Sequence, residues 1–156
     1  MKVNGTPTRT IWVRTHPTGG NAGAVDIIDQ TRLPHSFETK TLLTLEEAAH
    51  AIKAMLVRGA PLIGATAAYG LALAIHEDAS DARLSGAYDT LHATRPTAVN
   101  LRWALDEMMA ALKPLPTGER EAAAWARAAA IADEDVEICR QIGVNGLSII
   151  RDIAAR

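Results

Sequence analysis

Hydrophobic and polar positions follow a strand-like pattern in residues 1–43. Short runs of β-branched and aromatic residues at 10–13 and 24–28 predict two strands, because such side chains suit a pleated, half-buried surface. The segment between them, 16–23, is rich in the glycine, proline and asparagine that favour turns. The pattern predicts a β-hairpin with a long loop, and the run 37–41 predicts a third strand.

From Thr44 onward the apolar residues recur at helical spacing. Thr44 and Glu47 form a capping-box signature, in which each residue satisfies a backbone N–H at the start of a helix. The apolar positions that follow predict a helix up to Arg58. Gly59 is expected to end it, because glycine is common just past helix ends.

The next helix is expected to be the centre of the fold. Pro61 suits a first helical turn, and the run 62–75 is apolar on almost every side, which is typical of a helix surrounded by neighbours. Two further helices are predicted at 80–93 and 97–112. The patterns indicate an α+β, mainly α, domain over 1–156, with a small antiparallel sheet in 1–43 and a bundle of about five helices in 44–156.

The last segment predicts a long helix with one narrow seam of small side chains, formed by Ala122, Trp125, Ala129, Ala132, Val136 and Cys139. On this seam Cys139 is expected to be a buried core thiol. Gly143 and Gly146 are unfavourable inside a helix by about 1 kcal/mol each relative to alanine. They predict a bend or break near Asn145.

Composition excludes several classes of protein. Of 156 residues, 48% are hydrophobic and 22% charged, and the net charge is −2, without a basic block to follow a nucleic-acid backbone. The single cysteine rules out an internal disulfide and favours a reducing, cytoplasmic setting. No apolar run is long enough for a leader or a membrane span, and the five histidines lack the pairing of metal ligands. We expect neither nucleic acid, membrane nor metal as a partner.

Two segments share one arrangement, an arginine at a helix end followed by a proline. They are Arg58-Gly59-Ala60-Pro61 and Arg95-Pro96. A helix start offers free N–H groups and partial positive charge, and a guanidinium binds phosphate through two parallel hydrogen bonds. Either the two arginines form part of a pocket for a phosphorylated small molecule, or each only balances the negative end of its helix, worth about 0.3–1 kcal/mol.

Three ordered motifs carry a family resemblance. They are Ile28-Asp29-Gln30 with Leu33-Pro34, Val57-Arg58-Gly59-Ala60-Pro61 with Ile63-Gly64 and Ala67-Ala68-Tyr69-Gly70, and the run 93–101. Over essentially the whole chain they resemble the N-terminal part of the methylthioribose-1-phosphate isomerases of methionine salvage. That family is related to ribose-1,5-bisphosphate isomerases and to the regulatory subunits of the translation-initiation guanine-nucleotide exchange factor.

The resemblance implies an N-terminal domain that precedes a larger Rossmann-like domain, which is not in this chain. It implies a cytoplasmic, cofactor-free aldose–ketose isomerase that is homodimeric in full-length form. Substrate-contacting residues of the family fall on Arg58, Gly59, Ala60 and Arg95, whereas its catalytic cysteine and aspartate would lie beyond residue 156, and Cys139 does not match that cysteine. Asn145 stands where the family usually has histidine. The alternative is a non-catalytic regulatory or assembly domain.

Overall fold

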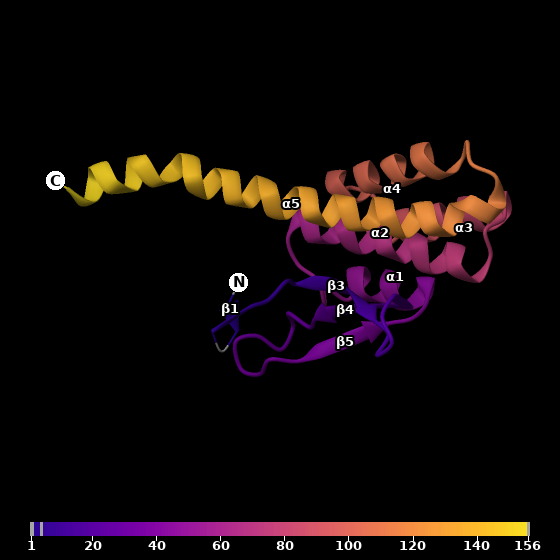
Figure 1. The fold of residues 1–156 in the computed structure, drawn as a ribbon, viewed down its shortest axis with the longest axis horizontal. Coiled ribbons are helices and arrows are strands. Elements are labelled where there is room, and N and C mark those ends of the chain that lie inside the picture. Colours follow the sequence, from indigo (N-terminus) through magenta and orange to yellow (C-terminus); the bar gives the residue numbers. More distant parts are fainter. Residues whose placement is uncertain (1, 4, 156) are drawn as a thin grey trace.

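A computed structural model describes residues 2–3 and 5–155. A small sheet lies against a bundle of helices, and the last helix projects far beyond the rest of the molecule (Figure 1). This is the α+β, mainly α, architecture expected from the sequence.

The strands form two separate sheets. β3 (Ile11–Thr15), β4 (Asn21–Ile28) and β5 (Thr39–Leu42) make an antiparallel sheet in that order, so the hairpin and the third strand are confirmed. Val25 in the central strand lies opposite Val13 on one side and Leu42 on the other. A short ribbon of β1 (Lys2–Val3) and β2 (Thr6–Pro7) was not expected, because strands this short carry no periodic signal.

The first helix, α1 (Leu45–Lys53), begins as predicted but ends five residues early. Thr44 caps it by accepting a hydrogen bond from the Glu47 N–H. At the other end Met55 adopts a left-handed φ of 57°, and the N–H groups of Met55 and Leu56 donate back to Ile52 and Ala51. This is a Schellman motif, which ends a helix by turning the chain away. The predicted extension to Arg58 is therefore wrong.

The central helix, α2 (Ala60–Glu77), is confirmed. Residues 62–75 are all buried, and α2 packs against α1, α3, α4 and α5 as well as β3 and β4. Pro61 lies in its first turn as expected. Because α2 touches every layer, it fixes the positions of the segments at its two ends.

The next two helices pack beside α2 and run in opposite directions to each other. α3 (Asp81–His92) matches its prediction within a residue, with Ser80 as cap. α4 (Val99–Leu112) starts two residues later than expected. Its start is delayed because the C=O of Arg95 accepts from the Ala98 N–H and closes a turn, so Pro96 lies in this turn and does not open the helix.

The last helix, α5 (Thr117–Ala154), corrects three expectations. Its buried side chains are Arg120, Ala124, Ala128, Ile131 and Ala132. Of the predicted seam, Ala132 is buried and Trp125 packs half-buried against the core, whereas Ala122, Val136 and Cys139 are exposed, so that part of the seam is wrong. Cys139 is exposed and not a core thiol, because the last buried residue of α5 is Ala132. The helix also runs unbroken past Asn145, because two glycines cost too little to interrupt a helix of 38 residues.

A membrane-spanning helix would have to be both long and strongly apolar. None of the helices in the described residues meets both conditions.

Candidate anion site at two helix starts

The first part of the site is the start of α2. Gly59 is the residue before the helix and has a φ of 94°, a conformation that side-chain-bearing residues rarely adopt. No side chain of the described residues caps this end, and Pro61 has no N–H to satisfy. The N–H groups of Ala60 and Leu62 have no acceptor within the helix, so this end can donate to an anion.

Arg58 stands immediately before this helix start. Its side chain is exposed, and its Nε donates weakly to the C=O of Met55, 3.4 Å away. Across the described part of the chain it forms no ion pair, whereas arginines such as Arg14 and Arg127 are paired with acids. The Arg58 guanidinium therefore has its charge available for a ligand.

The second part is the turn between α3 and α4. Thr94 closes α3 by donating its hydroxyl to the C=O of Leu91 at 2.6 Å. Arg95 follows, half-buried, and it too lacks an acidic partner among residues 2–3 and 5–155. α4 then begins at Val99 after Ala98, which provides no side-chain cap. The second helix start resembles the first: an unpaired arginine lies within four residues of uncapped N–H groups.

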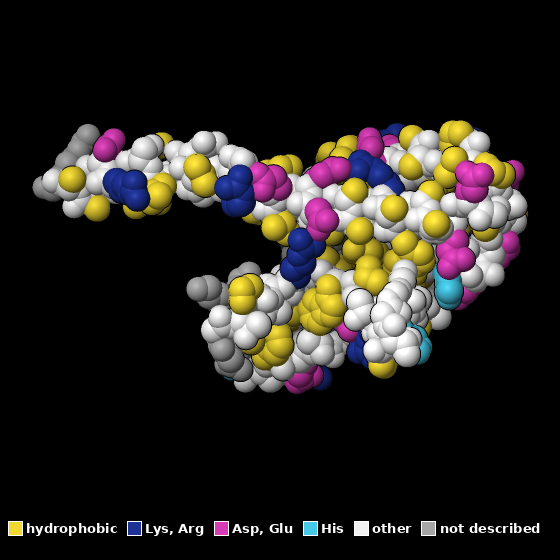
Figure 2. Space-filling model, in the orientation of Figure 1, with side chains coloured by type: hydrophobic (Ala, Val, Ile, Leu, Met, Phe, Trp, Pro, Cys, Tyr) yellow, Lys and Arg dark blue, Asp and Glu magenta, His cyan; other side chains and the backbone are white. Residues whose placement is uncertain are grey.

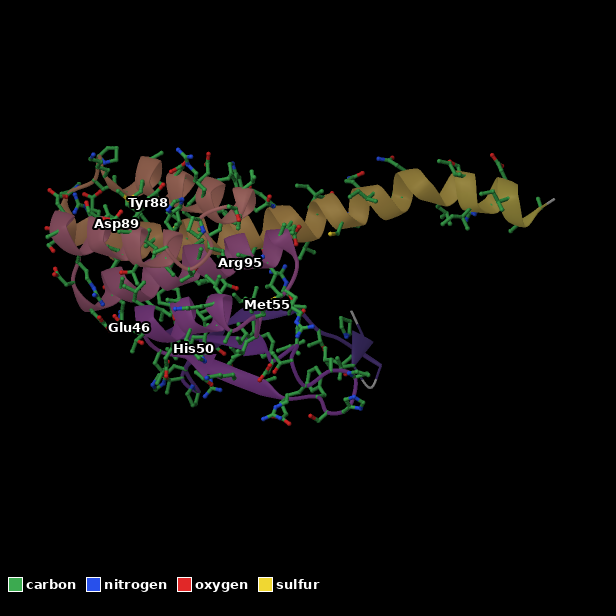
Figure 3. All side chains as sticks on the ribbon, turned by 180° about the vertical axis from the view of Figure 1, so that it is seen from behind. Glu46, His50, Met55, Tyr88, Asp89 and Arg95 are labelled. Carbon is green, nitrogen blue, oxygen red and sulfur yellow. The ribbon has the colours of Figure 1, made fainter. Side chains whose placement is uncertain are left out.

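A close contact brings the two helix starts to the same end of the bundle. A β-carbon added to Gly64 in α2 would lie 2.8 Å from the C=O of Asn100 and 3.4 Å from the Cβ of Ala104 in α4. The first turns of the two helices therefore lie against each other. Figure 3, the view from behind, labels Arg95 and Met55 at this same end of the bundle. Met55 is the residue whose C=O accepts the hydrogen bond from the Arg58 side chain.

The charges of this end bear on the alternative that each arginine only balances the negative end of a helix. Carbonyls at the end of α1 are already satisfied by the Schellman motif, so Arg58 is not needed there. Arg58 instead precedes the start of α2, where the partial charge is positive and a cation is unfavourable, whereas Arg95 lies between the negative end of α3 and the positive start of α4. An anion bound at the start of α2 would relieve this repulsion, and a phosphate can accept both from a guanidinium and from backbone N–H groups.

Asp29 and Gln30, from the first of the motifs that carry the family resemblance, have structural partners. The carboxylate of Asp29 accepts from the N–H and hydroxyl of Thr31, and the hydroxyl bond is the main reason that its pKa is lowered. The N–H of Gln30 donates to the C=O of Leu56 at 2.9 Å. The Gln30 bond attaches the loop after β4 to the turn that carries Arg58.

One hollow beside the site was missed by sequence reasoning. A cleft of about 510 Å³ lies between the first turns of α2 and the root of the projecting helix, with Arg9 and Ile11 on its third side (Figure 2). Its walls include Leu62, Ala65 and Val136. Because the lining comes from three segments far apart in the chain, no local motif indicates it. A shallower groove of about 370 Å³ lies beside the Arg95 turn, over Val99 and Trp103.

Chemically, this end of the molecule can bind but is poorly equipped to move protons. Guanidinium groups stay protonated at neutral pH, so Arg58 and Arg95 can hold and orient an anion without acting as acid or base. Among the described residues no group of three or more His, Cys, Asp or Glu side chains is arranged to hold a metal ion.

Comparison with known proteins identifies similar chains. A family profile described as the initiation factor 2 subunit family matches residues 56–155. A methylthioribose-1-phosphate isomerase from Paramagnetospirillum magneticum is 62% identical over 150 residues, which is 96% of this chain but 40% of that protein.

Two solved structures are also similar. The 5-methylthioribose 1-phosphate isomerase from Pyrococcus horikoshii gives a TM-score of 0.79 at 37% identity, over 90% of this chain and 40% of that one. The delta subunit of translation initiation factor eIF-2B from A. fulgidus gives 0.73 at 38% identity, over 84% and 38%. The chain thus spans about two fifths of the length of these relatives.

Proposed function

Because the chain belongs to the initiation factor 2 subunit family, we propose that it forms the substrate-holding N-terminal part of an aldose–ketose isomerase. The substrate is 5-methylthioribose 1-phosphate, which becomes 5-methylthioribulose 1-phosphate. The observation that carries this proposal is that Arg58 and Arg95, at two adjacent helix starts, have no acidic partner among the residues that the structure describes. The similarity to isomerases supports the choice of substrate.

In this proposal Arg58, Gly59, Ala60 and Arg95 bind the phosphosugar. The guanidinium groups of Arg58 and Arg95 contact the phosphate, and the N–H of Ala60 adds a backbone donor. Gly59 suits this role because its φ of 94° is readily adopted only by glycine, and Ala60 beside it is exposed. The role of the domain is to fix the substrate in one orientation.

The chemical step requires groups that these four residues do not provide. Phosphate on the anomeric carbon prevents simple ring opening to an aldehyde, so a positioned acid and base must act on the ring oxygen and on C1 and C2. We place these groups, a cysteine and an aspartate, in a second, Rossmann-like half of the full-length enzyme. We infer a cytoplasmic homodimer for that enzyme, without a cofactor.

The binding proposal is tested by thermal unfolding of the 156-residue chain with ribose 1-phosphate. A ligand at 100 times its Kd stabilises the folded state by about 2.7 kcal/mol, which raises Tm by roughly 5–10 °C in a chain of this size. Arg58→Ala and Arg95→Ala should each remove most of this shift. Arg151→Ala, which removes an exposed arginine from the projecting helix, should keep it.

A second candidate is a non-catalytic assembly domain. It is favoured by the similarity to the eIF-2B delta subunit, which is nearly as high as that to the isomerase. Absence of any shift with ribose 1-phosphate, or a shift that both arginine variants retain, would support this candidate. The gene sequence after codon 156 provides an independent test, because only the isomerase requires a cysteine and an aspartate in the following half.

A further inference from the structure

Asn100 interrupts the apolar stripe with which α4 faces α2. The stripe runs along α4 in steps of four residues, and its members Leu112, Met108 and Ala104 are fully buried. The next step along the same face reaches Asn100, in the first turn of the helix. A polar residue therefore lies where the periodicity predicts an apolar one.

The contacts of Asn100 place it between the two helix starts. A β-carbon added to Gly64 of α2 would meet both the C=O of Asn100 and the Cβ of Ala104, at 2.8 and 3.4 Å. Asn100 is itself half-buried. Because helical side chains lean toward the start of their own helix, the carboxamide of Asn100 is directed toward the turn that carries Arg95.

No hydrogen bond within the protein explains why this position is an asparagine. The carboxamide of Asn100 can both donate and accept, yet it forms no hydrogen bond with any of residues 2–3 and 5–155. Asn21, by contrast, accepts from the N–H of Gly23 at 2.8 Å and closes its turn. Asparagine is also a poorer helix former than alanine. A residue that breaks the local pattern without a structural gain is typical of a functional site.

The proposed phosphosugar site needs an acceptor that its other residues do not supply. The guanidinium groups of Arg58 and Arg95 and the N–H of Ala60 can only donate. The C=O of Gly59 already accepts from the Ile63 N–H at 3.1 Å. Donors are sufficient for the oxygens of a phosphate. A sugar hydroxyl, however, carries a hydrogen of its own, which requires an acceptor.

We propose that the side-chain Oδ1 of Asn100 accepts a hydrogen bond from the 2-hydroxyl of the bound sugar phosphate. The inference rests on the function proposed above, which places the phosphate at the two helix starts. The 2-hydroxyl is attached to the carbon next to the one that bears the phosphate, so a side chain beside the phosphate can reach it. Because the proposed reaction takes place at C1 and C2, this bond orients the reacting carbons and makes Asn100 a specificity-determining residue.

The contact is tested with ribose 1-phosphate and 2-deoxyribose 1-phosphate, which differ only in the 2-hydroxyl. Titration calorimetry of the natural chain should give a Kd at least tenfold higher for the deoxy compound, because that ligand leaves Oδ1 unpaired. Asn100→Ala should bring the two dissociation constants together. Their ratio is the readout, and a purely structural role of Asn100 would leave this ratio unchanged.

Two further variants separate the sugar contact from the rest of the site. Val99→Ala is the matched control, since Val99 lies in the same helical turn but is 78% exposed. It should keep the full preference for ribose 1-phosphate. Arg58→Ala should weaken binding of both sugar phosphates by a similar factor, because it removes a contact with the phosphate that they share.

Thermal unfolding without ligand verifies that the asparagine variant is folded. Asn100→Ala should have a Tm equal to or above that of the natural chain, since no hydrogen bond is lost and alanine favours the helix. A natural chain that binds the two sugar phosphates equally, or an Asn100→Ala variant that keeps the preference, would overturn this inference and leave the proposed phosphate site intact. Binding of neither ligand would overturn the proposed function, and this inference with it.

Discussion

The Cα of Gly64 faces the backbone carbonyl of Asn100 so closely that no side chain fits between them. A β-carbon there would lie 2.8 Å from the carbonyl oxygen, closer than real β-carbons approach such atoms. This contact holds the first turns of α2 and α4 together, and with them the two arginine-bearing segments. The candidate site therefore depends on a residue that does not itself touch the ligand in our proposal.

Gly64→Ala should destabilise the protein by about 1–2 kcal/mol, because the contact is overpacked and α4 must shift away from α2. The same shift should weaken binding of ribose 1-phosphate. Gly86→Ala in α3 is the control: its new β-carbon meets no neighbour, so the gain in helix propensity should stabilise the fold by about 0.5–1 kcal/mol. Urea unfolding measures both changes. If both variants changed the free energy of unfolding in the same direction, the result would contradict the close contact.

Arg120 joins two loops from inside the protein. Its guanidinium donates to the C=O groups of Leu115 and Ala79 at 3.0 and 2.8 Å and pairs with Asp81, while its own side chain is 6% exposed. Arg120→Met should cost about 2–4 kcal/mol, because two partly buried carbonyls lose their donor.

Asp81→Asn separates the ion pair at Arg120 from the carbonyl bonds. Asp81 is 83% exposed and returns to water when the pair is broken, so this variant should cost under about 1 kcal/mol. Comparable losses of unfolding free energy in Arg120→Met and Asp81→Asn would assign the stability to the ion pair instead.

Tyr69 predicts a loss of stability at high pH. Burial, with a contribution from Asp133, raises the pKa of its phenol to about 12 from an ordinary value of 10.0. The folded state holds this proton more tightly than the unfolded state does. Stability is therefore intact below about pH 10 and falls by about 2–3 kcal/mol as the pH rises to 12. Tyr69→Phe should flatten this fall, as measured by urea unfolding at a series of pH values, and an unchanged slope would exclude Tyr69 as its origin.

Asp26 predicts the corresponding behaviour in acid. Burial alone would raise the pKa of this carboxyl, but hydrogen bonds from Arg14 at 2.9 and 3.0 Å and from Thr41 at 2.7 Å outweigh burial and lower it. Its contribution to stability is present above the ordinary pKa and is lost as the pH falls through the lowered value. Asp26→Asn should cost about 1–2 kcal/mol at neutral pH. It should also weaken the acid dependence seen by circular dichroism; full retention of that dependence would rule out Asp26.

Local sequence patterns were sufficient to predict those helices whose burial and starts depend on residues close together in the chain. The run 62–75 could belong only to a buried helix, and Thr44 and Ser80 are chemically suited to cap the helices that they precede. The end of α1 was missed because its left-handed residue is Met55, whereas the usual signal is glycine. Periodicity continued through Leu56, which is buried by the turn and not by the helix.

The buried face of α5 could not be derived from its own sequence. Alanine is frequent all round its first half, so several faces are similarly apolar, and contact with α2 and α4 decides which one is covered. The buried residue Arg120 would be assigned to the solvent by any polarity pattern.

For the candidate site, the Gly-Ala-Pro and Arg-Pro sequences were enough to predict where the turns before α2 and α4 lie in the chain. Their convergence at one end follows from the alternating directions of α2, α3 and α4. The neighbouring cleft depends on segments that only the folded chain brings together.

The burial of α2 on all sides has a consequence for how such a scaffold can diversify. A substitution in the buried part of α2 disturbs its packing against four other helices. Arg58, just before the start of α2, borders solvent and can be replaced without repacking. New ligand specificities can therefore arise at the exposed start of α2 while the buried core stays unchanged. One architecture can in this way be inherited both by proteins named for sugar-phosphate isomerisation and by proteins named for translation initiation.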